Sequence, residues 1–238
     1  MQTLTKPIQI RRANDRGTTE IGWLHSRHSF SFGRYYDPQN MGYRSLRVIN
    51  DDVVEPNSGF GEHGHDNMEI ITWVLKGTLR HRDSTGTDGV IRPGEVQTMT
   101  AGRGIRHSEM NPSASEAVHL LQIWIEPSAL NLTPSYSQKE FAEEGRANRW
   151  QLLASPDARD ESLQIHQDAA LSVAELAAGK QVELALDNNR HGYVHVAFGN
   201  VRIGESTLAG GDAITFSGPA SLEIVANEKS QLLYFDLA

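Results

Sequence analysis

Gly61-Glu-His-Gly-His-Asp66 and Gly102-Arg-Gly-Ile-Arg-His-Ser-Glu-Met110 are the two stretches of this sequence that decide its fold. Side chains alternate between the two faces of a β-strand, so residues two apart share a face. His63 and His65 then point to one side of a strand, and the histidine and glutamate of the second stretch do the same. If the two strands face each other across a barrel, three imidazoles and one carboxylate surround one cavity.

This arrangement predicts a site for one divalent metal ion. The predicted ligands are His63, His65, His107 and Glu109. Imidazole and carboxylate donors suit Fe, Mn, Co, Ni, Cu or Zn, and open-site oxygen chemistry favours Fe(II). An isolated His-x-His is more simply a surface pair. The second pair, and the glycine-rich approach to both, favour a metal site. The chain has no cysteine, so sulfur ligands, disulfides and thiolate catalysis are excluded.

Composition limits the remaining function classes. A chain of 238 residues with 38% hydrophobic content can fill the core of one large all-β domain or two small ones. The net charge of −8 argues against direct binding to nucleic acid, which needs a basic face. No signal peptide and no apolar run long enough for a membrane span are recognisable, so we expect no membrane association and a cytoplasmic location.

Strand signals dominate the chain. Short runs rich in β-branched and aromatic residues alternate with turn formers. The expected strands include Leu46–Ile49, Glu69–Leu75, Thr78–Arg82, His119–Ile125, Tyr193–Phe198 and Gln231–Leu237. The pattern weakens near Glu126. Farther on, Ser137-Gln-Lys-Glu140 has capping-box spacing and Gly145 could end a helix, so a short helix of about two turns is predicted there.

The two halves of the chain share a layout. In each, a strand ends at a glycine, Gly77 or Gly199, and a glycine-acidic pair, Gly94-Glu95 or Gly211-Asp212, opens a later strand. This layout suggests an internal duplication of one barrel. The predicted organisation is a metal-binding barrel in 1–135, a connection with a short helix in 136–160, and a second barrel in 161–238 to which N-terminal residues could add strands.

Four stretches of the chain carry a family resemblance: Arg47-Val-Ile-Asn-Asp-Asp52, His63-Gly-His65, Met99-Thr-Ala-Gly-Arg-Gly-Ile-Arg-His-Ser-Glu109 and Ser162-Leu-Gln-Ile-His-Gln-Asp168. They resemble the pirin family, and within it the bacterial pirin-type quercetin dioxygenases. The resemblance extends from about Ile10 to Leu237. It implies an all-β bicupin with two jelly-roll barrels. It also implies a single metal site in the N-terminal barrel, with the same four ligands as above.

The resemblance implies an activity: cleavage of the flavonol quercetin with O2, releasing carbon monoxide and a depside, with Glu109 as the catalytic base. The alternative is a non-enzymatic, pirin-like metal or redox sensor that acts through a protein partner, since a ligand set does not by itself define a function. A sugar-isomerase-like cupin would need polar pocket residues that the sequence does not reveal. In cupins generally the carboxylate ligand falls at Glu69, which we expect here to support the site or to serve as a fifth ligand.

The other histidines and the aromatic residues give no comparable indication of a site. His191 and His195 are four residues apart, so the second barrel is expected to be metal-free and structural. No partners are evident for the other isolated histidines, which are His81, His119 and His166. The aromatic cluster Phe30-Ser-Phe32 with Tyr35-Tyr36 could line a pocket for a planar ligand, although such clusters more often belong to a core.

Overall fold

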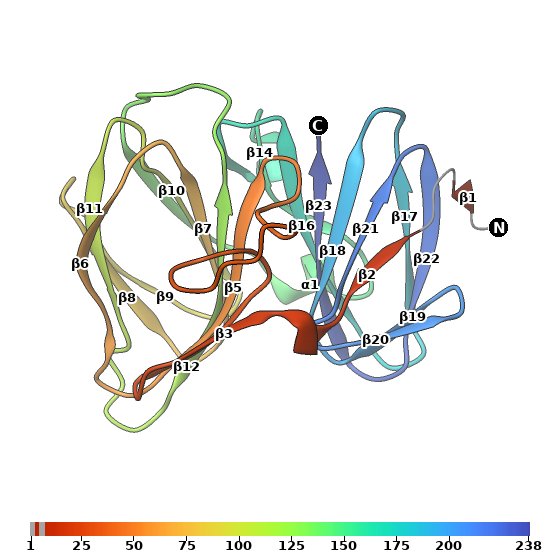
Figure 1. Cartoon of the computed structure of the whole chain (residues 1–238), viewed down its shortest axis with the longest axis horizontal. Coiled ribbons are helices and arrows are strands. Elements are labelled where there is room, and N and C mark those ends of the chain that lie inside the picture. Colours follow the sequence, from red (N-terminus) through yellow and green to blue (C-terminus); the bar gives the residue numbers. More distant parts are fainter. Residues whose placement is uncertain (1–2, 5–7) are drawn as a thin grey trace. The chain divides into compact units, whose positions relative to one another are not determined.

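The computed structural model describes residues 3–4 and 8–238, and its regular secondary structure is almost entirely β-strand (Figure 1). The chain forms two compact units. The N-terminal unit comprises Gly17–Phe141 and Leu163–Gln167, and the C-terminal unit comprises the described residues up to Arg16, Ala142–Ser162 and Asp168–Ala238. The predicted all-β bicupin is confirmed. Among the residues described, no helix is both long and apolar enough to span a membrane.

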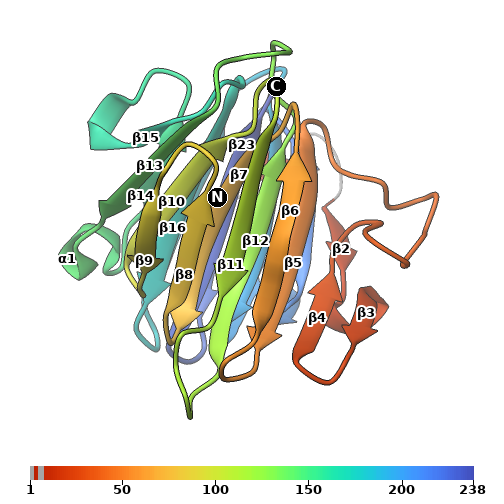
Figure 2. The same ribbon diagram turned by 90° about the vertical axis from the view of Figure 1, so that its left-hand side faces the viewer.

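Two antiparallel sheets build the N-terminal unit. Its strands are β3 (Gly17–Glu20), β4 (Leu24–His28), β5 (Leu46–Val54), β6 (Gly59–His65), β7 (Glu69–Lys76), β8 (Leu79–Asp83), β9 (Asp88–Ile91), β10 (Glu95–Thr100), β11 (Ile105–Met110), β12 (Val118–Ile125), β13 (Ser135–Glu140) and β15 (Leu163–Gln164). One sheet has seven strands in the order β13-β10-β7-β12-β5-β4-β3. The other has four, β6-β11-β8-β9, and faces the viewer in Figure 2; the two-residue strand β15 belongs to neither sheet.

The interior of the N-terminal unit is apolar at two ends and polar across its middle. One apolar cluster contains Leu24, Val54, Val74, Leu79, Ile91, Val118 and Leu120, and another contains Ile70, Met99, Ala101 and Ile105. Between them, strand register places five polar residues side by side on neighbouring strands: His28, Asn50, Gln122, Thr72 and Gln97. This row crosses the seven-stranded sheet, and buried polar groups of this kind need partners.

The C-terminal unit repeats the two-sheet arrangement. Its elements are β1 (Thr3–Leu4), β2 (Gln9–Arg11), a 3₁₀ turn (Ala13–Asp15), α1 (Glu143–Arg146), β14 (Gln151–Ser155), a second 3₁₀ turn (Arg159–Glu161), β16 (Ala169–Leu176), β17 (Gln181–Leu186), β18 (His191–Phe198), β19 (Asn200–Ile203), β20 (Ser206–Ala209), β21 (Ala213–Ser217), β22 (Ala220–Ala226) and β23 (Ser230–Leu237). One sheet runs β14-β16-β23-β18-β21-β2. The other contains β1, β22, β19 and β20, with β17 paired to β22. The interior of the C-terminal unit contains one large apolar cluster, to which both sheets contribute.

Matching glycines support the internal duplication. Gly77 and Gly199 both have positive φ, +79° and +89°, and each follows the corresponding strand of its unit. A Cβ on Gly77 would lie 2.8 Å from the carbonyl oxygen of Ala117, and one on Gly199 would lie 2.4 Å from that of Lys229. In both units the glycine therefore packs against the start of an interior strand of the sheet, β12 or β23, where a side chain would not fit.

The predicted helix at Ser137–Glu140 is wrong in position. These residues belong to β13, which pairs with β10 over six residues. The four-residue helix α1 begins later, at Glu143, and contains Gly145 instead of ending there. Local capping-box spacing was outweighed by the free edge of β10, whose backbone groups pair with this segment.

Candidate metal centre and its pocket

Two neighbouring strands of the four-stranded sheet, β6 and β11, contain the predicted ligands, and a third, β8, adds two more residues to the same face. His63 on β6 lies directly opposite His107 on β11. On the other side of β11, Asp83 of β8 is opposite His107, and His81 is opposite Glu109. Because directly paired residues share a face of a sheet, all five side chains point into the unit.

The three histidines converge through the same ring nitrogen. Nε2 of His107 lies 2.9 Å from Nε2 of His65 and 3.0 Å from Nε2 of His63. Two imidazole nitrogens bound at about 2.1 Å to one metal ion, at right angles, are separated by about 3 Å. The three nitrogens are thus spaced as neighbouring ligands of a divalent metal ion would be, and the donor set fits such an ion.

The protonation of these histidines also fits metal binding. Burial, followed by repulsion from His63, lowers the pKa of His65 to about 4. Burial and the neighbouring histidines lower the pKa of His107 to about 2. Both rings are neutral near pH 7, so their lone pairs are available to a metal ion without loss of a proton.

Glu109 approaches the cluster from a different side. Its carboxylate accepts two hydrogen bonds from Nε2 of Gln122, at 2.8 and 3.1 Å. Its possible ligand atom lies within 4.8 Å of those of His81 and His107, in a second group that shares only His107 with the first. Burial raises the pKa of Glu109 above its usual value. Glu109 faces the same pocket as His63.

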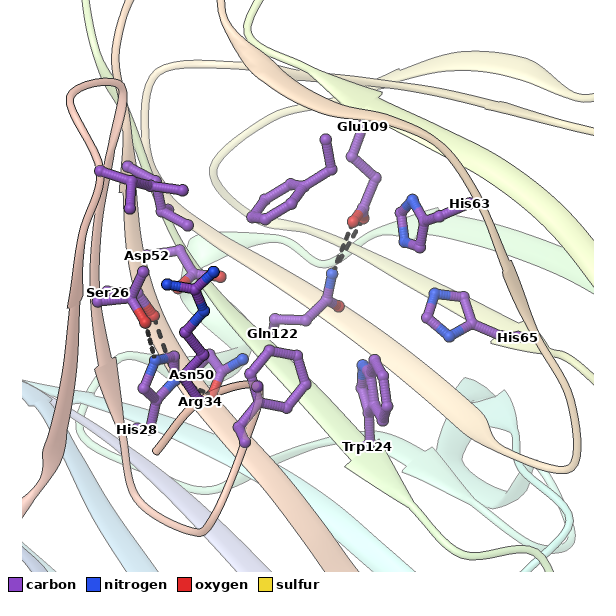
Figure 3. Close-up of a pocket in the computed structure, with 16 residues that line it drawn as sticks. Ser26, His28, Arg34, Asn50, Asp52, His63, His65, Glu109, Gln122 and Trp124 are labelled. Atoms are coloured by element: carbon purple, nitrogen blue, oxygen red, sulfur yellow. Dashed lines mark hydrogen bonds between the residues drawn. The ribbon is translucent and has the colours of Figure 1, made fainter. Parts of the chain in front are cut away.

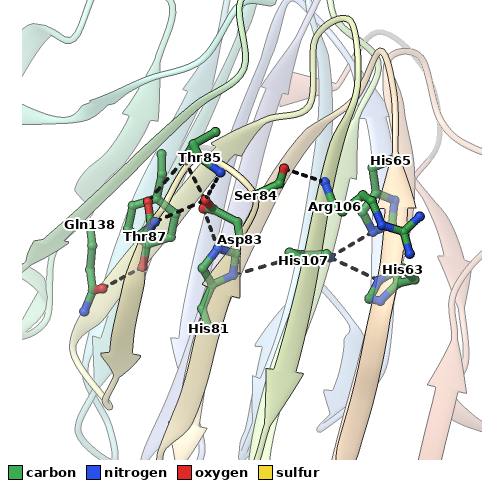
Figure 4. A network of polar contacts seen from close by, with 11 residues as sticks. His63, His65, His81, Asp83, Ser84, Thr85, Thr87, Arg106, His107 and Gln138 are labelled. Carbon is green, nitrogen blue, oxygen red and sulfur yellow. Dashed lines mark hydrogen bonds and ion pairs between the residues drawn. The ribbon is translucent and has the colours of Figure 1, made fainter.

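The sequence reading missed the support behind His107. Nε2 of His81 lies 2.9 Å from Oδ2 of Asp83, with both side chains fully buried, and Nδ1 of His81 lies 3.4 Å from Nδ1 of His107 (Figure 4). The Asp83 carboxylate in turn accepts hydrogen bonds from the backbone and hydroxyl of Thr85. A metal-binding histidine usually has its second nitrogen held in this way, which fixes the orientation of the ring. In the sequence, the spacing His81-x-Asp83 could have indicated this pair, because residues two apart share a face of a strand.

Glu69 lies outside both groups of metal-ligand candidates found among the described residues. Its carboxylate accepts a hydrogen bond of 2.9 Å from the Thr100 hydroxyl and lies 3.4 Å from Nδ1 of His166. His119, another histidine without an expected partner, lies 2.6 Å from Asp51. Both histidines therefore have carboxylate partners that the sequence did not reveal.

A cavity of about 390 Å³ opens beside His63, His65 and Glu109 (Figure 3). This volume is within the range of small-molecule sites. The wall combines apolar and polar groups. Its residues are Thr19, Ile21, Leu24, Ser26, His28, Phe32, Gly33, Arg34, Asn50, Asp52, Phe60, His63, His65, Glu109, Gln122 and Trp124. The ring of Trp124 packs edge-on against that of His65, with centroids 4.8 Å apart.

The aromatic residues of the wall come from unexpected positions. Of the aromatic cluster considered in the sequence, Phe32 lines the cavity, Phe30 is buried, and Tyr36 is 72% exposed. Phe60 shares the face of His63 although it is three residues away. A β-bulge explains this: Ser108 is opposed by two residues of β6, so Phe60 lies opposite Glu109.

Comparison with known proteins agrees with this geometry. The Pirin family model matches residues 9–125, and the model of the quercetinase C-terminal cupin domain matches residues 152–237. A protein of Escherichia coli (strain K12) named quercetin 2,3-dioxygenase is 46% identical over 231 residues, which cover 97% of this chain and 98% of that protein.

Solved structures of related proteins also resemble this chain over nearly its whole length. The crystal structure of YhhW from Escherichia coli superimposes with a TM-score of 0.93 at 45% identity, covering 98% of both chains. A structure titled as bacterial pirin YhhW in complex with nickel(II), also from Escherichia coli, gives a TM-score of 0.91 at 45% identity, covering 97% of this chain and 99% of that one. The sequence, the fold and these relatives together show that the chain belongs to the pirin family.

Proposed function

We propose that this protein is a metal-dependent dioxygenase that cleaves quercetin, or a similar flavonol, with O2. The observation that carries the proposal is the convergence of three imidazole nitrogens at the wall of an aromatic-lined cavity that also contains a buried carboxylate. The relatives named quercetin 2,3-dioxygenase support the reaction type. The proposed products are carbon monoxide and a depside.

In this proposal His63, His65, His107 and Glu109 hold one divalent metal ion. Fe(II) is favoured by the oxygen chemistry, and nickel(II) is the ion named for the Escherichia coli structure. When bound, the ion would act as a Lewis acid for substrate oxygens and as a centre for dioxygen.

The remaining contributions come from the chain itself. Glu109 accepts the proton of the flavonol 3-hydroxyl at a carboxylate oxygen, since it is a buried carboxylate that faces the cavity beside His63. Gln122 holds this carboxylate through both oxygens and so orients it. Phe60 and Trp124 flank the planar substrate and keep bulk water away from the reacting ring.

The test combines metal analysis with oxygen uptake. Protein purified without added metal is analysed for metals, then loaded separately with Fe(II), Ni(II), Mn(II), Co(II), Cu(II) or Zn(II), and oxygen consumption with quercetin is recorded. The double variant His63→Ala, His107→Ala should lose both metal and turnover. His25→Ala is the matched control, since that histidine is on the same unit with a half-exposed side chain. Absence of turnover with every metal would refute the proposal and favour a metal or redox sensor.

A further inference from the structure

Two neighbouring aspartates on β5 have opposite surroundings. Asp51 faces outward from the cavity and pairs with His119 at 2.6 Å. Asp52 points to the other face of the strand, is 3% exposed, and lines the cavity. Strand register places it directly opposite Ser26 of β4, with which its carboxyl group shares a hydrogen bond. Of the two, Asp52 alone can meet a ligand in the cavity.

One oxygen of Asp52 has no partner. Within residues 3–4 and 8–238, no hydrogen bond reaches Oδ1, although the atom is buried. Leaving a buried acceptor unsatisfied is costly, so such atoms usually receive a donor from elsewhere. Nearby His28 is already engaged, because its Nδ1 lies 2.8 Å from Oδ1 of Asn50 and its Nε2 lies 2.8 Å from the Thr19 hydroxyl. Oδ1 of Asp52 is therefore an acceptor without a partner on a residue that lines this side of the cavity.

Asp52 lies across the cavity from the candidate metal centre. Figure 3 shows Asp52 and Ser26 on the opposite side of the cavity from His63 and His65. Apolar side chains, including that of Phe32, contribute to the wall. A planar molecule whose oxygen donors lie at the histidines would extend along this wall and bring its far end to Asp52.

We propose that Asp52 is a specificity-determining residue that hydrogen-bonds a phenolic hydroxyl on the end of the substrate remote from the metal centre. The inference deepens the proposed function and rests on it. It narrows the substrate class to polyhydroxylated planar aromatics. A carboxylate accepts from the phenol at Oδ1, and a protonated carboxyl still pairs with the phenol, either accepting at its carbonyl oxygen or donating its O–H.

The test is a binding experiment without turnover. The metal-loaded protein is titrated under argon with quercetin and with 3-hydroxyflavone, which keeps the hydroxyl-ketone end but lacks all other hydroxyls, and quenching of tryptophan fluorescence gives both dissociation constants. Wild type should prefer quercetin by about tenfold or more. In Asp52→Leu this ratio should fall to within about twofold, and Asp52→Asn, which keeps a carbonyl oxygen, should retain part of it. The matched control Asp51→Asn should keep the wild-type ratio.

Each outcome decides the inference. An unchanged ratio in Asp52→Leu, with circular dichroism and metal content like those of wild type, would overturn it. So would a wild type that binds both flavonols equally. If Asp52→Leu does not fold, an unchanged ratio in Asp52→Asn together with a changed one in Asp51→Asn overturns it. If quercetin binds with the expected ratio of dissociation constants but the protein consumes no oxygen, the proposed dioxygenase activity is refuted and Asp52 remains the residue that determines selectivity. If neither ligand binds, both proposals are refuted.

Discussion

The protonation of Asp52 has a consequence for the stability of the metal-free protein. Burial raises the pKa of this carboxyl from an ordinary value of 3.8 to about 7, against a lowering contribution from the Ser26 hydrogen bond. The charges of Asp51 and Glu109 raise it further and that of His119 lowers it. The folded state therefore keeps a proton that the unfolded chain releases, so this group's contribution to stability is complete below about pH 4 and is lost as the pH rises to 7.

Asp52→Asn removes this titration and should change the pH profile in a defined way. A shift of about three pKa units, at about 1.4 kcal/mol each, corresponds to a change on the order of 4 kcal/mol. Relative to wild type, the free energy of unfolding of Asp52→Asn should therefore rise by up to that amount between pH 4 and pH 7, then level off. Asp51→Asn should not show the full gain, because Asp52 still titrates in that variant and only the smaller contribution of the Asp51 charge to its pKa is lost.

The assay is urea unfolding of chelator-treated protein at half-unit pH steps, followed by tryptophan fluorescence. Three of the four tryptophans lie in the N-terminal unit, so the signal reports mainly on the unit that contains Asp52. A constant difference between Asp52→Asn and wild type across this pH range would show that Asp52 is already ionised in the folded state, and would refute the reasoning.

Three further results are expected. His63→Ala and His107→Ala should each abolish stoichiometric metal binding without unfolding the chain, because the apolar clusters of the barrel and not the ion form its core; near-equimolar metal in the double variant, by elemental analysis, would exclude this site. Glu109→Gln should lower metal-normalised turnover of quercetin by about 10²- to 10⁴-fold and Glu69→Gln by at most about 100-fold, and the reverse order would assign the carboxylate role to Glu69. His81→Phe should weaken metal binding about 10- to 100-fold in competition with a chelator, since it removes the contact that orients the His107 ring. An unchanged metal affinity would show that this contact does not contribute to metal binding.

The common face of His63 and His65 could be predicted because its signal is local. His63 and His65 share a strand, and period-two alternation alone fixes their common face. The polar row across the large sheet could not be predicted in the same way. His28, Asn50 and Gln122 come from three strands, and only the pairing register makes them neighbours. A sequence without related sequences beside it contains no direct record of that register.

The same distinction explains the two corrections to the sequence reading. His81 was read as an isolated histidine because its relation to His107 arises between β8 and β11, through strand pairing. The segment Ser137–Glu140 was read as a helix because its spacing satisfied a local rule, whereas pairing with β10 determines its structure. Where local and non-local signals compete in this fold, inter-strand hydrogen bonding prevails.

The bulge in β6 affects how related sequences should be aligned. Over the span facing His107 and Glu109, β6 contains one residue more than β11, yet His63 and Phe60 both face inward. A relative with a one-residue gap between these two positions would pair regularly and still present the same two side chains to the cavity. A one-residue gap between His63 and His65 would instead send one imidazole to the opposite face of the sheet. Of two alignment gaps of equal length, only a few positions apart, one thus preserves the candidate metal centre and the other disrupts it.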